Sequence, residues 1–246
     1  MFGSIGAALA DLIYPPSCAW CRVSLPPRSK LAFCHDCSDR LAPSVVAMCR
    51  HCSAPLHNPA LDSKRCFHCA RDSHPWHRAV ALGRYRGELS QAILRTKRPR
   101  NEPLTIALAE LLFVQRKESL AELSCDCIIP MPMHWLRRWR RGINGPELLA
   151  EVLAGRLKLP VKRRWLRRIR ITPLQTDLSV TNRLRQQRGS FRASRIAPIR
   201  GRRILLVDDV LTTGATAAEA ARMLLARGAE QVSLAAIARG LGDDAS

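Results

Sequence analysis

Eight of the ten cysteines fall into four Cys-x-x-Cys pairs near the beginning of the chain. Two cysteines separated by two residues can wrap a tight turn around one Zn²⁺ ion, and two such turns complete a tetrahedral thiolate site. The four pairs therefore predict two structural zinc sites. Their ligands are Cys18, Cys21, Cys34, Cys37, Cys49, Cys52, Cys66 and Cys69.

The spacing leaves two ways of sharing these ligands open. Sequential pairing gives each ion two neighbouring pairs, as in a tandem zinc ribbon, whereas cross-braced pairing lets alternate pairs share an ion. Either arrangement needs metal to fold, so zinc removal is expected to unfold residues 17–75. The chain has no pattern typical of an export signal, which favours metal ligation over disulfides and predicts a cytoplasmic protein.

A second chemical motif spans residues 204–216, where a β-branched and leucine-rich run ends in Asp208 and Asp209. In open α/β sheets, ligands bind beyond the carboxyl ends of the strands, and the amides of a following helix attract phosphate. The two carboxylates would suit a ribose diol together with Mg²⁺. The predicted phosphate cradle consists of Thr212, Thr213, Gly214, Ala215 and Thr216. The alternative is a strand end followed by a threonine helix cap, with no ligand.

The elements that must position this motif begin after residue 76, where short turns rich in cysteine give way to longer periodic segments. Strands are expected at 80–85, 126–131, 204–207 and 231–238, and helices at 88–97, 103–118, 146–159 and 217–227. Strands that alternate with helices predict a parallel α/β sheet. We therefore expect an α/β protein with two domains. Residues 1–76 would form an N-terminal helix and the zinc ribbon, and residues 77–246 the parallel-sheet domain.

The composition narrows the class of partner. Apolar residues make up 47% of the chain, which excludes global disorder, and no apolar run approaches the roughly 20 residues that cross a bilayer. No membrane insertion is expected. The formal net charge of +20 attracts polyanions, either nucleic acid or phosphorylated metabolites.

Much of the positive charge lies between residues 135 and 170, where tryptophans alternate with arginines. Aromatic rings can stack on bases while guanidinium groups follow a phosphate backbone, so this segment predicts binding of single-stranded nucleic acid. The candidate contacts are Trp135, Arg137, Arg138, Trp139, Arg140 and Arg141, and Trp165 extends the pattern. A helix with its tryptophans on a core face and its arginines in solvent is the alternative.

Residues 207–216, Val-Asp-Asp-Val-Leu-Thr-Thr-Gly-Ala-Thr, resemble the signature with which type I phosphoribosyltransferases bind 5-phosphoribosyl diphosphate (PRPP). The four cysteine pairs, Arg141-Gly-Ile-Asn144 and the pattern Gln175-x-x-Leu178-x(4)-Arg183 extend the likeness over nearly the whole chain. Together they resemble the ComF family of competence proteins and its gluconate-linked relatives. The resemblance implies a double zinc ribbon followed by a type I phosphoribosyltransferase domain, with PRPP and Mg²⁺ as ligands.

The resemblance also implies roles for single residues. Asp208 and Asp209 would contact the ribose hydroxyls, residues 212–216 the 5′-phosphate, and Lys97 would belong to the catalytic group. Further ligand contacts are implied for Pro130, which lies in the pyrophosphate loop, and for Arg141, Gln175 and Arg183.

For function, the resemblance implies a protein that binds PRPP or a ribose 5-phosphate group and serves DNA uptake in natural transformation. It would handle single-stranded DNA with a DNA-translocating helicase as its partner. The alternative is an active phosphoribosyltransferase of nucleotide metabolism without a DNA role. Such an enzyme would displace pyrophosphate from ribose C1 through an oxocarbenium-like state that arginines and Mg²⁺ stabilise.

Overall fold

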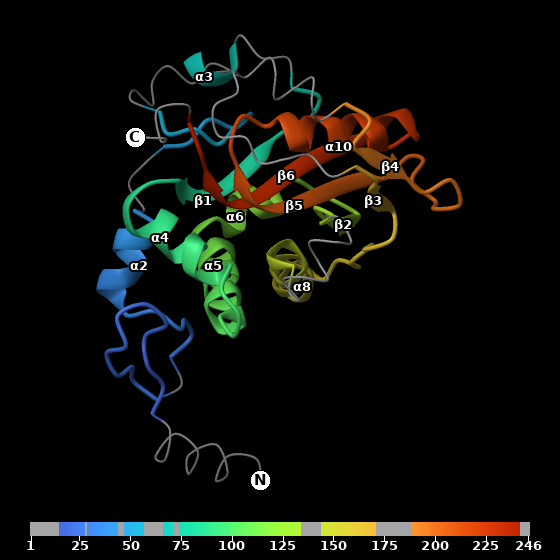
Figure 1. Ribbon diagram of the computed structural model, residues 1–246. Helices are drawn as coiled ribbons and strands as arrows, with labels where there is room; N and C mark the ends of the chain where they lie inside the picture. Colours follow the sequence, from blue (N-terminus) through green and yellow to red (C-terminus); the bar gives the residue numbers. More distant parts are fainter. Residues whose placement is uncertain are drawn as a thin grey trace, which may run out of the picture.

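A parallel sheet forms the centre of the molecule (Figure 1). The computed structural model describes residues 15–27, 29–43, 47–56, 66–70, 74–133, 144–170 and 188–241. The four strands have the order β1-β6-β5-β2, and each neighbouring pair is parallel. They are β1 (Ala79–Arg84), β2 (Cys127–Pro130), β5 (Arg203–Leu211) and β6 (Gln231–Arg239). The predicted α/β class is confirmed.

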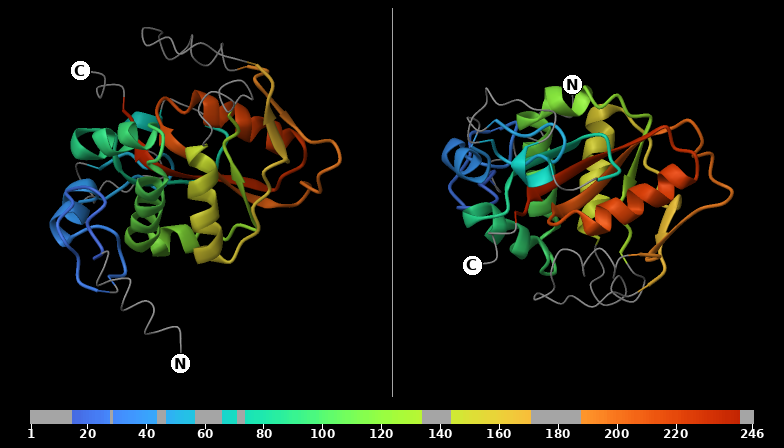
Figure 2. Two further views of the ribbon diagram at one scale, coloured as in Figure 1. Left: turned by 60° about the horizontal axis from the view of Figure 1, so that its bottom comes forward. Right: turned by 90° about the horizontal axis from the view of Figure 1, so that it is seen from above.

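Helices cover both faces of this sheet (Figures 1 and 2). One face packs on α4 (Gly87–Thr96), α5 (Glu102–Gln115) and α8 (Gly145–Leu157), and the other on α10 (Ala215–Ala226). Successive side chains of a strand point to opposite faces of a sheet. In β5, Leu205 and Val207 therefore face α4, α5 and α8, while Ile204 and Leu206 face α10. With both faces covered, the strands are almost entirely apolar, which explains why they could be recognised in the sequence.

Two elements of this domain differ from the expectation. The predicted helix at 103–118 ends at Gln115, and a separate short helix, α6 (Lys117–Ala121), follows. Strand β5 continues to Leu211 rather than ending at residue 207, because Asp208 and Val210 still lie opposite Ala236 and Ala238 of β6. The paired carboxylates therefore belong to the strand itself, and the neighbouring strand fixes their backbone.

A small antiparallel ribbon was not predicted. It pairs β3 (Leu166–Arg168) with β4 (Phe191–Ala193), so that Arg167 and Arg192 stand directly opposite each other. Its buried side chains include Leu166 and Phe191, which join the core on the α10 side of the sheet. Three-residue strands that contain arginine show no apolar period, so the ribbon left no signal in the sequence.

The cysteine-rich segments pack on the sheet domain in two places. The first carries α2 (His35–Leu41) and lies beside α4, where the Trp20 indole N–H donates to Glu88 Oε2 at 2.7 Å. The second carries α3 (Phe67–Ala70), and its Ser53 Oγ accepts the Ala81 amide of β1 at 2.8 Å. The predicted domain boundary after residue 76 stays a prediction. Among the described residues, no helix is long and apolar enough to cross a membrane.

Candidate functional site

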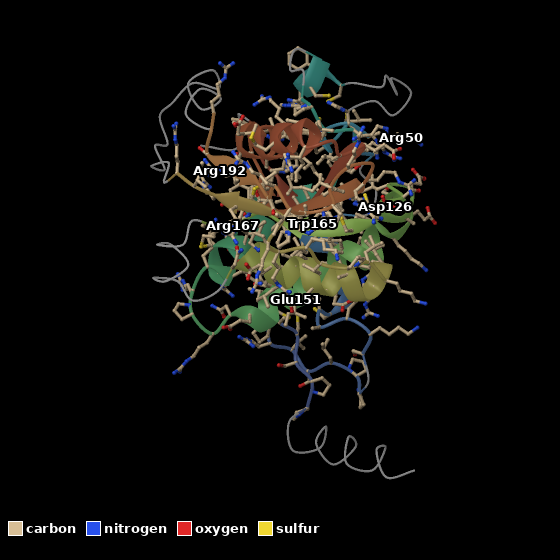
Figure 3. The ribbon with its side chains drawn as sticks, turned by 90° about the vertical axis from the view of Figure 1, so that its right-hand side faces the viewer. Arg50, Asp126, Glu151, Trp165, Arg167 and Arg192 are labelled. Atoms are coloured by element: carbon tan, nitrogen blue, oxygen red, sulfur yellow. The ribbon has the colours of Figure 1, made fainter. Side chains whose placement is uncertain are left out.

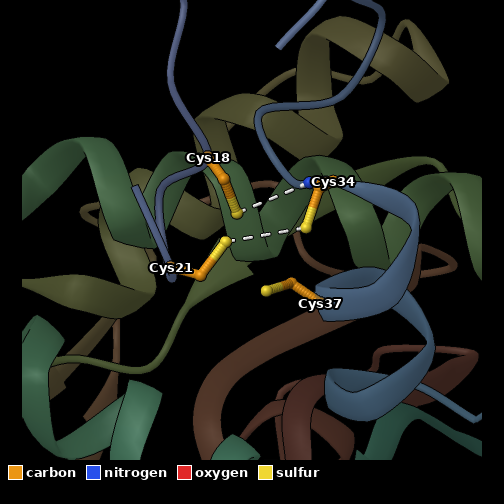
Figure 4. Close-up of side chains that lie close together, drawn as sticks. All are labelled: Cys18, Cys21, Cys34 and Cys37. Carbon is orange, nitrogen blue, oxygen red and sulfur yellow. Dashed lines mark hydrogen bonds between the residues drawn. The ribbon is translucent and has the colours of Figure 1, made fainter. Parts of the chain in front are cut away.

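The first two cysteine pairs meet in one cluster (Figure 4). The sulfur atoms of Cys18, Cys21, Cys34 and Cys37 all lie within 4.8 Å of one another. The Cys34 amide donates to Cys18 Sγ at 3.4 Å, and the Arg40 guanidinium donates to Cys37 Sγ at 3.3 Å. Such donors stabilise thiolates, the form in which cysteine ligates metal.

The last two pairs, Cys49, Cys52, Cys66 and Cys69, form a second cluster that is buried. Its Sγ distances are 3.8 Å for Cys49–Cys69, 3.6 Å for Cys52–Cys66 and 3.9 Å for Cys66–Cys69. A regular tetrahedron with Zn–S bonds of about 2.3 Å has edges of about 3.8 Å, so this donor set fits Zn²⁺. A hydrogen bond from the Cys52 thiol lowers the pKa of Cys49 to about 4. The two clusters are consistent with two zinc sites whose ligand pairs are sequential, and the cross-braced alternative is wrong.

The two remaining cysteines lie outside both clusters. Burial raises the pKa of Cys125 to about 12 and that of Cys127 to about 11. Both pack among apolar side chains, Cys125 against the core on the α5 and α8 side of the sheet and Cys127 in the core on the α10 side, so they behave as small core residues.

The paired carboxylates lie near the carboxyl end of β5, half-buried. The Asp209 amide donates to Asp208 Oδ1 at 2.9 Å, and the Val210 amide donates to Asp209 Oδ1 at 2.8 Å. Burial, and then the charge of Asp209, hold the pKa of Asp208 well above its usual range. Lys97 Nζ stands 3.7 Å from Asp209 Oδ2, so the structure brings together three of the predicted residues.

The loop between β5 and α10 has the geometry of an anion cradle. Gly214 adopts the left-handed conformation with φ +77°, and α10 begins at the next residue without a side-chain cap. The Ala215 amide reaches only Thr213 Oγ1, at 3.4 Å. Within the described residues, the amides of Thr216 and Ala217 have no acceptor. These N–H groups and the helix dipole favour an anion at this place.

Asn144 was not among the predicted site residues, although it lies in a motif that carried the family resemblance. It precedes α8 and is 5% exposed, and its Oδ1 has no hydrogen-bond partner in the described part of the chain. The next two residues, Gly145 and Pro146, line a small cavity of about 50 Å³ together with Lys97 and Asp209. A buried amide oxygen without a partner, next to residues that line this cavity, is a further candidate ligand contact.

A larger cleft of about 530 Å³ opens at the carboxyl end of β2. Pro130, a predicted contact, lines it together with apolar side chains, Glu147 and four arginines. The lining arginines are Arg163, Arg164, Arg167 and Arg168. Figure 3 shows this side of the molecule, with Arg167 and Arg192 of the β3–β4 ribbon labelled. Within the described residues, neither of these two arginines pairs with a carboxylate.

Trp165 lies beside the cleft but is half-buried against the core on the α10 side of the sheet, with Lys162 Nζ 5.5 Å from its ring centre. The other predicted nucleic-acid contacts lie outside the described residues, as do three predicted ligand contacts. These are Trp135, Arg137, Arg138, Trp139, Arg140, Arg141, Gln175 and Arg183.

Comparison with known proteins supports both halves of this description. Residues 9–70 match the double zinc ribbon domain, and residues 146–244 match the phosphoribosyl transferase domain. The chain is 33% identical to the DNA utilization protein YhgH of Salmonella typhimurium, in an alignment that covers 94% of this chain and 100% of that protein. It is 32% identical to the YhgH protein of Escherichia coli K12 over the same shares of the two chains. It is 30% identical over 90% of its length to 96% of competence protein F of Haemophilus influenzae. The chain therefore belongs to the competence protein F family, whose members join a double zinc ribbon to a phosphoribosyltransferase domain.

Proposed function

We propose that this protein binds PRPP, or another ligand that ends in ribose 5-phosphate, at the carboxyl end of β5. The proposal rests on one juxtaposition: Asp208 and Asp209, with Lys97 3.7 Å from the second carboxylate, precede the free amides of α10. The amides would bind the 5′-phosphate, and the carboxylates would accept hydrogen bonds from the ribose hydroxyls. Mg²⁺ would neutralise the diphosphate. Lys97 would add a positive charge on the same side.

Calorimetric titration with PRPP and Mg²⁺ tests this proposal. Replacing both carboxylates in Asp208→Asn/Asp209→Asn removes two charge-assisted hydrogen bonds worth about 1.5–3 kcal/mol each, so the affinity should fall at least about 100-fold. The matched control is Asp126→Asn. Asp126 precedes β2 at the amino end of the parallel strands, away from Asp208 and Asp209, and accepts hydrogen bonds from Arg203, so PRPP affinity should not change. Undiminished affinity in the double variant would contradict the assignment.

We also propose that the protein handles single-stranded DNA, since its relatives include proteins named for DNA utilization and for competence. Among described residues, two features support this proposal. They are the cleft lined by Arg163, Arg164, Arg167 and Arg168, which we call the arginine cleft, and the position of Arg192 directly opposite Arg167 on the β3–β4 ribbon. Like charges opposite each other on a ribbon repel, and a polyanion would relieve that repulsion. A DNA-translocating helicase is the partner that we propose from the family likeness, and the cytoplasm is the compartment.

Fluorescence anisotropy with a labelled oligonucleotide across a series of salt concentrations tests the DNA proposal. For single strands, each lost phosphate contact lowers the salt slope by about 0.7, so Arg167→Gln/Arg192→Gln should lower it by about 1.4. The control Lys117→Gln/Arg202→Gln removes the same charge elsewhere on the surface. A slope that falls equally in both variants would show that only net charge matters.

Whether the protein also catalyses phosphoribosyl transfer is a separate question, and a measurement of pyrophosphate release answers it. If the protein is a phosphoribosyltransferase, an acceptor attacks ribose C1 as the bond to the diphosphate oxygen breaks, and the chain's main task is to position and neutralise charge. Incubating the protein with PRPP, Mg²⁺ and each of the common nucleobases should then release pyrophosphate. PRPP binding without any release would favour a ligand-sensing role.

A further inference from the structure

The second zinc cluster and the phosphate loop are joined by two buried side chains. We propose that the knuckle between Cys49 and Cys52 holds the loop at residues 211–214 in its binding conformation. Zinc at the second cluster and ribose phosphate at the loop would then stabilise each other's binding. The ligand part of this inference rests on the function proposed above.

Arg239 forms the first connection. It is the last residue of β6, is only 5% exposed, and in the described part of the chain it donates to backbone carbonyls alone. Its Nε donates to the carbonyl of the zinc ligand Cys52 at 2.9 Å. Its Nη1 donates to the carbonyls of Leu211, at 2.8 Å, and of Thr212 in the loop, and to that of Gly240. One guanidinium thus fixes the knuckle backbone relative to the loop backbone.

Trp76 forms the second connection. Its indole N–H donates to the carbonyl of His51, which lies between the two cysteines of the same knuckle, at 2.9 Å. The ring is 2% exposed and stacks on His74 at 4.0 Å between ring centres. Its far edge lies against Gly214, where a Cβ would come within 2.5 Å of Trp76 Cη2. The loop can occupy this place only because residue 214 has no side chain.

Both connections begin at carbonyl groups inside one Cys-x-x-Cys turn, the part of the chain that a bound zinc ion would fix most firmly. Without zinc, nothing at the centre of the turn holds those two carbonyl groups in place. Arg239 and Trp76 would each lose one hydrogen-bond acceptor of fixed position. Because coupling between two sites is reciprocal, a ligand that stabilises the loop must also slow zinc loss from this cluster. The first cluster packs on α4 instead, and so supplies an internal reference.

The test follows zinc loss from each cluster separately in the full-length, zinc-loaded protein. A zinc-selective chelator that leaves Mg²⁺ in solution is added with iodoacetamide, and mass spectrometry of peptides measures alkylation of each cysteine. Saturating PRPP should slow alkylation of Cys49, Cys52, Cys66 and Cys69 about 5-fold or more. Alkylation of Cys18, Cys21, Cys34 and Cys37 should keep its rate.

Two tryptophan variants form a matched pair. Trp76→Phe keeps a ring against Gly214 but removes the hydrogen bond to the second knuckle, whereas Trp20→Phe removes an indole hydrogen bond from the first knuckle. PRPP protection of the second cluster should shrink in Trp76→Phe and persist in Trp20→Phe. Arg239→Lys, which keeps the charge without the forked donors, should shrink it as well. Equal protection of both clusters, or full protection in Trp76→Phe, would overturn the inference.

The coupling can also be observed without PRPP. Hydrogen exchange during the same chelation should accelerate in residues 211–218 as soon as the second cluster is alkylated, before it accelerates in α8. If calorimetry detects no PRPP binding while this acceleration occurs, the proposed ligand is wrong but the connection stands. If PRPP binds and loop exchange does not respond to zinc loss, the connection itself is wrong.

Discussion

Replacing Gly214 by alanine should destabilise the protein strongly, for two reasons that can be separated. The residue has φ +77°, a left-handed conformation that costs an alanine about 1–2 kcal/mol. The new Cβ would also lie 2.5 Å from Trp76 Cη2, well inside ordinary carbon contact, and overpacking of this kind costs about 1–3 kcal/mol. The free energy of unfolding should therefore fall by about 2–5 kcal/mol.

Gly201 supplies the matched control for the backbone part of this loss. It has φ +70°, and a Cβ there would meet nothing within 4 Å, so Gly201→Ala should cost only about 1–2 kcal/mol. Urea unfolding of the zinc-loaded proteins, followed by tryptophan fluorescence, measures both losses, and calorimetry should show weaker PRPP binding for Gly214→Ala only. Equal losses in the two variants would refute the close packing of Trp76 on the phosphate loop.

Four further predictions concern pH, metal and charge. Burial raises the pKa of Asp208, so its carboxyl keeps a proton to higher pH than usual, and binding of PRPP with Mg²⁺ must displace that proton. The affinity for PRPP should therefore rise with pH up to the raised pKa of Asp208. Calorimetry in buffers of different ionisation enthalpy should detect the released proton. The Arg203 amide and guanidinium lower the pKa of Asp126 in the folded protein. This ion pair therefore stabilises the fold above the unfolded-state pKa of Asp126, and the stabilisation is lost as pH falls through the lower folded-state pKa. Asp126→Asn should flatten the acid side of the curve of stability against pH. Chelation of zinc should unfold residues 17–75, seen as loss of exchange protection there, and readdition of zinc should restore it. Lys97→Met should weaken PRPP binding about 10-fold through loss of one charge-assisted contact, whereas Lys117→Met should not.

The parts that the sequence predicted well are those encoded by neighbouring residues. Paired cysteines mark each knuckle locally, and the phosphate loop is continuous with the strand before it and the helix after it. Each apolar strand could be recognised because burial on both faces leaves a nearly unbroken apolar run.

The parts that were missed depend on contacts between distant segments. Nothing near Arg239 indicates that its guanidinium reaches Cys52, and nothing near Trp76 points to Gly214. The arginine cleft likewise forms only when β3 packs beside the end of β2, which places residues of separate segments around one space. Spacing in a sequence predicts chemistry within a motif, whereas the neighbours of that motif are decided by the fold.

The order of the strands has a consequence for how the protein is made. Strand β1 lies at an edge of the sheet, and among the described strands its partner is β6, the last of them in the sequence. During synthesis both cysteine clusters leave the ribosome early and can take up metal, while β1 lacks its strand partner until residues 231–239 emerge. A chain that stops short of β6 would also lack Arg239, so Trp76 would be the one of the two connections left between the metal-bound knuckle and the loop. Completion of β6 thus gives β1 its strand partner and, through Arg239, adds the other of the two connections between the metal-bound knuckle and the loop.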